Sequence, residues 1–387
     1  MPAPNQRTYD AIHDKNVELY GKRIKRAYNR TIDEVVKLTY KLSLDRNSEF
    51  YWRNNKDVSK KVDKLLKQLN TEVYGITVNG IDQEWGLAVD KNNEIAIYAA
   101  GDKLQELPSK YKNKWFTSNE GAKNAFLKRK INGLGLSDKV WKNTRQMKVE
   151  LELALEVGIG KGKSAANLSK DIRGYLNKPD SLYRKVRSNQ NAINSKLADL
   201  KLLKDNDAAL SQIRSVKTEI DKLRLKGTLR LSKAAKAYKP GRGVYRSSFK
   251  NALRLTVNET NFSYETGGRE KREQQDFIVG IEIKVSPSHV ASDDSGGISC
   301  LQLQGKYPKN YNWDSKNHTN CKCSSFNILK TRDELDKDID NILAGKEPNT
   351  PSKNQVSKNP ASFNKYVKEN NELWKNWKNK PRFLVNQ

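Results

Sequence analysis

The sequence predicts an α+β fold that is predominantly α-helical, with a small β-containing domain toward the C-terminus and a helical-hairpin (coiled-coil) insertion. Two observations lead to this prediction. Apolar residues recur at three- and four-residue spacing through long stretches, which is the pattern of amphipathic helices. Two short segments, 277–285 and 324–329, are instead rich in β-branched and aromatic residues, as strands are.

The first 139 residues are expected to form a helical region. Residues 10–45 carry one apolar stripe, and His13 at its polar start is expected to face solvent. Residues 57–100 begin with a helical stretch, and their apolar continuation fits a helix or a strand. Residues 120–157 are expected to be helical again, interrupted near Gly133 and Gly135. The stripe of the first helix consists of Val17, Tyr20, Ile24, Tyr28, Ile32, Val36 and Tyr40.

The glycine-rich run at 158–164 is close to a phosphate-binding loop but does not meet its spacing. Val157 stands where that motif needs glycine, and the preceding residues have helical rather than strand character. We therefore expect a glycine turn after one helix, with Ser164 as the N-cap of the next.

Residues 184–232 are predicted to form an antiparallel helical hairpin, with its turn near Lys204–Asp207. Between residues 181 and 250 there are 18 Lys and Arg against 5 Asp and Glu, about +13 of the total net charge of +28. The hairpin is therefore either a solvated coiled coil without a ligand, or a basic arm that binds nucleic acid or an acidic neighbour. The candidate nucleic-acid-binding residues are Arg184, Lys185, Arg187, Lys217, Lys222, Arg224, Lys226, Arg230, Lys233 and Lys236.

Composition limits the kinds of partner this protein can bind and the cellular compartments that suit it. A net charge of +28 implies an anionic partner, which is nucleic acid, an anionic lipid surface or an acidic protein. No run is long and apolar enough for a membrane span, and the N-terminus lacks the apolar core of a signal peptide. Three cysteines, an odd number, argue against a disulfide framework and favour a reducing compartment.

All three cysteines lie in one stretch of the chain together with a histidine. Cys300, His318, Cys321 and Cys323 are the ligand types of a structural zinc site, and the two predicted strands flank them. The alternatives are a zinc-bound clasp between the strands and a hydrogen-bonded or packed loop without metal. A catalytic metal is disfavoured, because four protein ligands leave no open position for water.

The run from Tyr245 to Lys330 carries the motifs of a known family. An Arg254-Leu-Thr stretch is followed by Glu259-Thr-Asn261, and Asp293, Asp294, Cys300 and Gly305 precede a closing His318-Thr-Asn-Cys321-Lys-Cys323. This pattern resembles the Mu F-like head morphogenesis, or minor head protein, family of tailed bacteriophages, in versions seen in phages and prophages of Bacteroidetes-type hosts. Thr319 and Lys322 stand where that family usually has Pro and Arg.

The resemblance implies a structural, non-enzymatic minor head protein of the virion. Such a protein is made in the host cytoplasm, joins the head in several copies near the portal protein and the major capsid protein, and contacts packaged double-stranded DNA. The mature head has no membrane, and some members leave the particle with the genome. The Mu F-like domain is assigned to 140–335, a range that contains the hairpin. The residue pattern predicts a helical region at 1–139 and a linker and tail at 336–387, in which the stretch 346–362, with three Pro and many Asn, Ser and Lys, is the linker. The tail carries Trp374, Trp377, Phe383 and Leu384, which could dock as aromatic anchors.

Two other function classes stay open from the sequence. One is a phage-delivered toxin-like enzyme, either a nuclease that uses His289, His318 and Asn320 or an ADP-ribosyltransferase that uses Glu270 and Glu273. Glu270 and Glu273 also fit an exposed helix face. The other is a cellular nucleic-acid-binding protein with a zinc knuckle.

Overall fold

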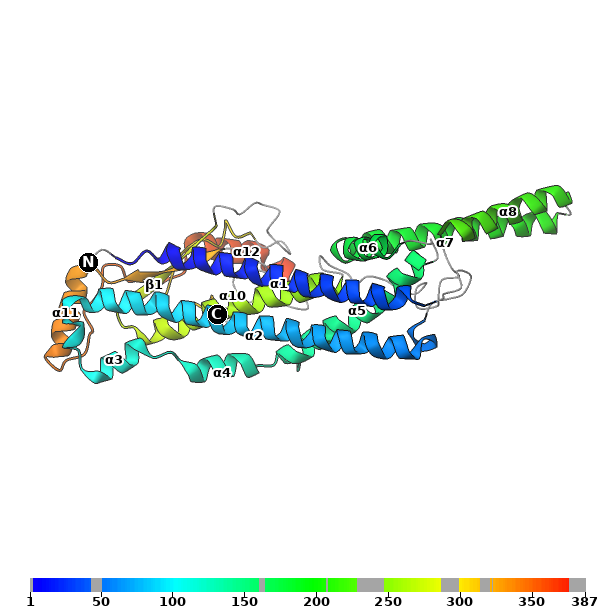
Figure 1. The fold of residues 1–387 in the computed structure, drawn as a ribbon. Helices are drawn as coiled ribbons and strands as arrows, with labels where there is room; N and C mark the ends of the chain where they lie inside the picture. The colour runs from blue at the N-terminus through cyan, green and yellow to red at the C-terminus, as the bar shows by residue number, and fades with distance from the viewer. Residues whose placement is uncertain are drawn as a thin grey trace. The chain divides into compact units, whose positions relative to one another are not determined.

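The computed structural model describes the chain except residues 1–2, 43–50, 160–163, 207, 228–246, 287–298, 314–320, 322 and 376–387, and except the side chains of 156–159, 179–190 and 224–227. The fold is mainly helical with a three-stranded antiparallel sheet near the C-terminus, which confirms the predicted α+β class (Figure 1). The helices are α1 (Gln6–Tyr40), α2 (Lys56–Ala100), α3 (Ser109–Phe116), α4 (Glu120–Lys128), α5 (Leu136–Ile159), α6 (Ala165–Asn177), α7 (Pro179–Asp205), α8 (Leu210–Gly227), α10 (Ser248–Gln274), α11 (Arg332–Leu343) and α12 (Ala361–Lys375).

The described chain divides into two compact units. The first unit comprises residues 1–21, 76–133 and 256–387, and the second comprises 22–75 and 134–255. Helices α1, α2 and α10 contribute residues to both. These units are interleaved along the chain, unlike the contiguous ranges 1–139, 140–335 and 336–387 expected from the sequence, which stay a prediction.

Helix α2 settles the ambiguity left by the sequence over residues 57–100, because it runs unbroken from Lys56 to Ala100. Gly80 lies inside it at a close approach to α10. A Cβ added to Gly80 would lie 2.7 Å from Thr260 Cγ2, so a larger side chain would push the two helices apart. Glycine there serves packing and does not signal a turn.

The sheet of the first unit has the strand order β2-β1-β3. Strand β1 (Ile278–Lys284) pairs with β2 (Gly305–Tyr307) and with β3 (Ser324–Leu329), so it is the central strand. Most of its residues are buried on both faces, which explains its nearly continuous apolar run. The predicted strands at 277–285 and 324–329 are thus confirmed, whereas the short β2 was missed.

The segment after α11 is pinned to the first unit, although it has no regular secondary structure until α12. The Glu334 carboxylate accepts hydrogen bonds from the Lys353 N–H (2.9 Å) and the Ser352 hydroxyl (2.7 Å). The Val356 N–H donates to the Val279 carbonyl, and a Cβ at Gly280 would lie 2.7 Å from Val356 Cγ2. The predicted linker at 346–362 is therefore a fixed strap against the sheet, and the predicted tail contains α12.

In the second unit, α7 and α8 lie side by side as the predicted antiparallel hairpin (Figure 1). Ile220 on α8 is buried, while Leu197 on α7, which the heptad spacing places inward, is 41% exposed. Ser164 caps α6 as expected, since its side chain accepts from the Asn167 N–H. Residues 160–163, where the glycine turn was expected, lie outside the described part.

Candidate metal centre and nucleic-acid interface

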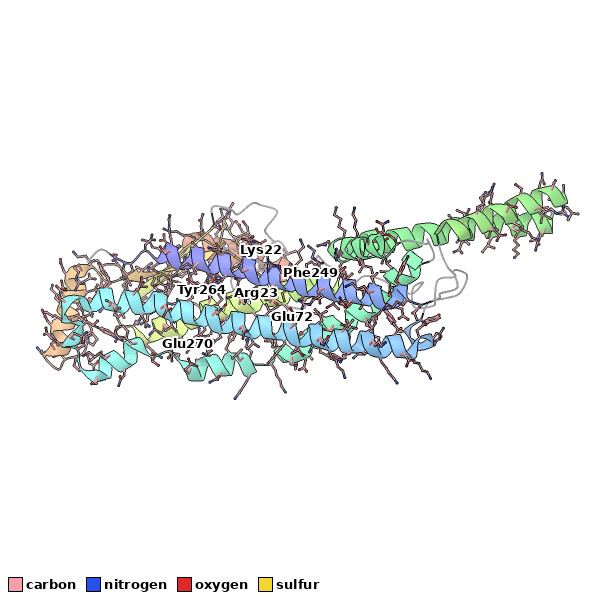
Figure 2. The ribbon with its side chains drawn as sticks, viewed as in Figure 1. Lys22, Arg23, Glu72, Phe249, Tyr264 and Glu270 are labelled. Carbon is pink, nitrogen blue, oxygen red and sulfur yellow. The ribbon has the colours of Figure 1, made fainter. Side chains whose placement is uncertain are left out.

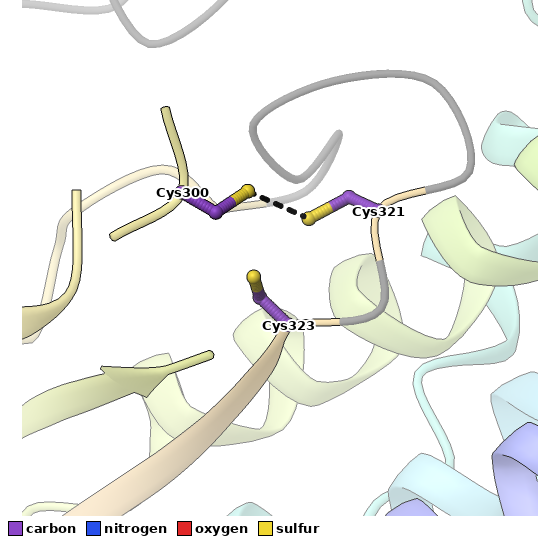
Figure 3. Close-up of side chains that lie close together, drawn as sticks. All are labelled: Cys300, Cys321 and Cys323. Atoms are coloured by element: carbon purple, nitrogen blue, oxygen red, sulfur yellow. Dashed lines mark hydrogen bonds between the residues drawn. The ribbon is translucent and has the colours of Figure 1, made fainter. Parts of the chain in front are cut away.

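Cys300, Cys321 and Cys323 form one buried cluster in the first unit (Figure 3). Cys321 and Cys323 immediately precede β3, and Cys300 lies in the turn before β2. Their sulfur atoms lie within 4.8 Å of one another, and each residue is at most 2% exposed. The Sγ atoms of Cys300 and Cys321 are 3.7 Å apart, too far for a disulfide, so the three are thiols.

This donor set fits a metal ion. Zn–S bonds of about 2.3 Å in a tetrahedron place neighbouring sulfurs roughly 3.8 Å apart, close to the Cys300–Cys321 separation. Three thiols whose sulfurs already converge can become thiolate ligands with small side-chain rotations. His318, the fourth predicted ligand, lies outside the described residues, as do His289, Asp293 and Asp294.

Helix α12 covers the cysteine cluster with aromatic side chains. Phe363, Tyr366 and Trp374 belong to the same buried core as the three cysteines. The Tyr366 hydroxyl accepts from the Ser299 N–H at 2.9 Å, next to Cys300, and Phe363 stacks edge-on against Tyr307 with ring centroids 5.5 Å apart. Trp374, a predicted aromatic anchor of the tail, therefore packs into the core of this same chain. The other predicted anchors, Trp377, Phe383 and Leu384, lie outside the described part.

Three residues of the helix motif on which the family resemblance rests have structural roles in α10. The Thr256 hydroxyl hydrogen-bonds the Thr77 hydroxyl at 2.8 Å, and Glu259 pairs with Arg129. Asn261 Oδ1 lies 2.9 Å from His13 Nε2. These contacts connect α10 to its neighbours in the first unit, and the three α10 residues that make them, Thr256, Glu259 and Asn261, are buried.

His13 is buried rather than solvent-facing, so that prediction was wrong. Its Nδ1 lies 2.6 Å from Glu84 Oε2, and its ring stacks on Tyr264 with centroids 4.3 Å apart. The sequence did carry a signal for this burial, because His13 lies four residues before Val17 and so continues the apolar stripe of α1. Its hydrogen-bond partners could not be predicted, because Glu84 and Asn261 lie on α2 and α10, far away in the sequence.

Two further buried ionisable groups were missed by sequence reasoning. Lys271 on α10 donates to the Asn93 side chain (2.8 Å) and to the carbonyls of Trp115 and Thr117, and burial lowers its pKa to about 8. Glu150 on α5 accepts from the Ser248 N–H at the start of α10, and burial raises the pKa of this carboxyl to about 7. Both side chains are hydrogen-bonded to fixed partners, which indicates a role in the fold.

The positive charge is concentrated in one unit. The second unit has 42 Lys and Arg against 18 Asp and Glu, a net charge of +24, whereas the first unit has 31 against 27, a net charge of +4. The cysteine cluster and the basic excess therefore belong to different units. A polyanion would be attracted to the second unit far more than to the first.

Within the hairpin, the positive excess lies toward the base. Residues 191–223 contain 6 basic and 5 acidic residues, and Lys196 on α7 pairs with Glu219 on α8 at 2.7 Å. Lys217 and Lys222 are exposed on α8. The side chains of Arg184, Lys185, Arg187, Arg224 and Lys226 are not described, and Arg230, Lys233 and Lys236 lie outside the described residues.

Glu270 and Glu273, the candidate transferase pair, both bind Arg269 on α10. Arg269 lies 2.8 Å from Glu270 and 2.6 Å from Glu273, an ion-pair cluster along α10. This matches the helix-face alternative considered from the sequence.

No family model, curated protein or solved structure matches this chain. Among the described helices, none is both long enough and apolar enough to cross a membrane.

Proposed function

We propose that this protein is a structural minor head protein of a tailed bacteriophage, of the Mu F-like family. The observation that carries the proposal is the meeting of the three signature cysteines in one buried cluster beside β3. Cys300 is separated from Cys321 by 20 intervening residues, yet the fold brings the sulfurs of all three cysteines together. A cysteine cluster that holds two strands together is the kind of structural element that the members of a family would keep as a sequence motif.

In this proposal the cysteine cluster holds a structural zinc ion, with His318 as the fourth ligand. The ion would link the turn before β2 to the start of β3 and so tie together the two outer strands of the sheet, in the core that α12 shares. When bound, zinc supplies cross-linking of the loops and no redox chemistry. The thiols lie in an apolar, aromatic core, which suits a structural ion better than a reacting one.

The second unit would bind the packaged double-stranded DNA and the first unit would face the portal and capsid proteins. The net charge of +24 against +4 supports this division of roles. Phosphate contacts require no base recognition, so scattered Lys and Arg suffice for binding of any sequence. Made in the host cytoplasm, the protein would occupy the virion head in several copies and leave with the genome in some cases.

Duplex-DNA binding measured against salt concentration tests the DNA role. We expect that replacing Arg184, Lys185, Arg187, Arg230, Lys233 and Lys236 with Gln lowers the affinity and reduces the slope of log K against log salt by up to about 5, since each lost phosphate contact reduces it by about 0.9. Deleting residues 191–223 removes 6 basic and 5 acidic residues, among them the candidates Lys217 and Lys222, and should reduce the slope by at most about 2. Equal slopes for wild type and the six-residue variant would contradict the proposed interface.

A further inference from the structure

A second candidate anion site lies in the second unit, away from the hairpin sequence. A cleft of about 440 Å³ opens between one face of α5 and the chain around the short 3-10 helix Trp52–Asn54. One side of the cleft is lined by Arg145, Lys148 and Glu152 of α5, whose spacing places them on one face of the helix. The other side is lined by Tyr51 and Arg53.

The wall of the cleft is fixed by Trp52, which is 4% exposed. The Trp52 backbone N–H donates to Glu152 Oε1 at 3.1 Å, and its indole N–H donates to the Lys148 carbonyl at 3.3 Å. Next to this anchor, the Arg53 guanidinium carbon lies 4.4 Å from the centre of the Tyr51 ring. These contacts fix the wall of the cleft and place the Arg53 guanidinium beside the Tyr51 ring before any ligand arrives, which lowers the entropic cost of binding.

The cleft carries an excess of positive charge. Lys148 is paired with Asp63 at 2.5 Å, and Glu152 is engaged by the Trp52 N–H. Arg53 and Arg145 are exposed, and within the described part of the chain neither has a carboxylate partner. Ser59, in the first turn of the long helix α2, also lines the cleft, so the positive end of that helix dipole adds to the field.

We propose that this cleft binds a phosphate group of a nucleic-acid backbone, with Arg53 and Arg145 as its two guanidinium clamps. Guanidinium groups match phosphate geometry through paired N–H donors, and the Tyr51 ring supplies an aromatic surface beside them for a sugar or base. The surrounding unit has a net charge of +24, which favours a polyanion over a small neutral ligand. The inference rests on the proposed nucleic-acid role of the second unit and deepens it, through residues other than those at 184–236.

Arginine footprinting on the wild-type protein tests the site without relying on a variant that must fold. Phenylglyoxal modification is followed by mass spectrometry, with a short oligothymidine or inorganic phosphate as the protecting probe. We expect the oligothymidine to protect Arg53 and Arg145 but not Arg23, an exposed arginine of the same unit on α1 (Figure 2). Protection by inorganic phosphate alone would identify a free-anion site, and no protection by either probe would also overturn the proposal.

Affinity measurements on charge-matched variants complete the test. Arg145→Gln should weaken oligothymidine binding about tenfold, the cost of one charge-assisted hydrogen-bonded contact. Lys142→Gln removes the same charge from α5 outside the cleft and should change affinity by less than about twofold. Equal losses would show a diffuse charge effect and refute a built site. Because the variants at 184–236 test duplex binding separately, failure of one proposal leaves the other measurable.

Discussion

Replacement of Cys321 by Ser should abolish zinc binding and make the free energy of unfolding independent of zinc. The Sγ atoms of Cys300 and Cys321 lie at about the spacing of a zinc tetrahedron, so loss of one thiol removes a full coordination bond from a buried site. At free zinc about a hundred times its Kd, the bound ion contributes roughly 3 kcal/mol to the free energy of unfolding. A metal-free cluster would instead lose only about 1–3 kcal/mol on burying a hydroxyl in place of the thiol.

The assay is metal analysis together with denaturant unfolding, with and without a chelator. The wild type should carry about one zinc ion per chain, and the chelator should lower its free energy of unfolding by roughly 3 kcal/mol. The Cys321→Ser protein should contain no zinc and be insensitive to the chelator. Wild-type protein prepared with zinc present that contains none, and whose unfolding the chelator leaves unchanged, would refute the metal centre.

Three further predictions concern the fold. The pKa of Glu150 is raised to about 7 by burial, so its protonated form stabilises the fold below about pH 4.5 and that stability, about 3 kcal/mol, is lost as pH rises through 7. Glu150→Gln should flatten this loss in pH-dependent denaturation, and an unchanged profile would contradict the assignment. Gly280→Ala should cost about 1–3 kcal/mol by clashing with Val356, and Val356→Ala should restore part of it in a double-mutant cycle; additive costs would argue against the contact. Hydrogen bonds from the strap at residues 346–360 lower the pKa of Glu334 to about 2, so the stability that this carboxylate contributes is present above pH 4.5 and is lost as the pH falls toward 2. Glu334→Gln should therefore make residues 346–360 more accessible to proteases at neutral pH. Equal digestion of the variant and the wild type would count against the strap.

Local pattern predicted the elements whose own residues decide their conformation. The apolar stripe of α1, the hairpin of α7 and α8, and the β-branched strands β1 and β3 follow from spacing within each segment. Strand β2 and helix α12 were missed because they depend on distant partners: β2 has three residues and exists by pairing with β1. The polar sequence of 346–360 suggested a linker, and only Glu334 and Val279, remote in sequence, make it a strap.

The cysteine cluster was predictable because its ligands are rare residues close in sequence. The spacing of Cys321 and Cys323 placed them together, and the flanking strands brought Cys300 to them. The stripe of α1 indicated that His13 is buried but not which groups it binds, and Lys271 gave no signal, since the partners of both residues lie in other parts of the chain. The difference in net charge between the two units could not be predicted from the sequence either, because each unit is assembled from separate stretches of chain.

A protein inventory of purified particles, with stoichiometry by quantitative mass spectrometry, tests the central proposal most directly. Cells that encode this chain would be induced to release phage particles, and the particles freed of soluble protein. The proposal predicts peptides of this chain in the particles, at a fixed number of copies relative to the portal and major capsid proteins. Abundant chain in the cells but none in the purified particles would contradict a structural role in the phage head.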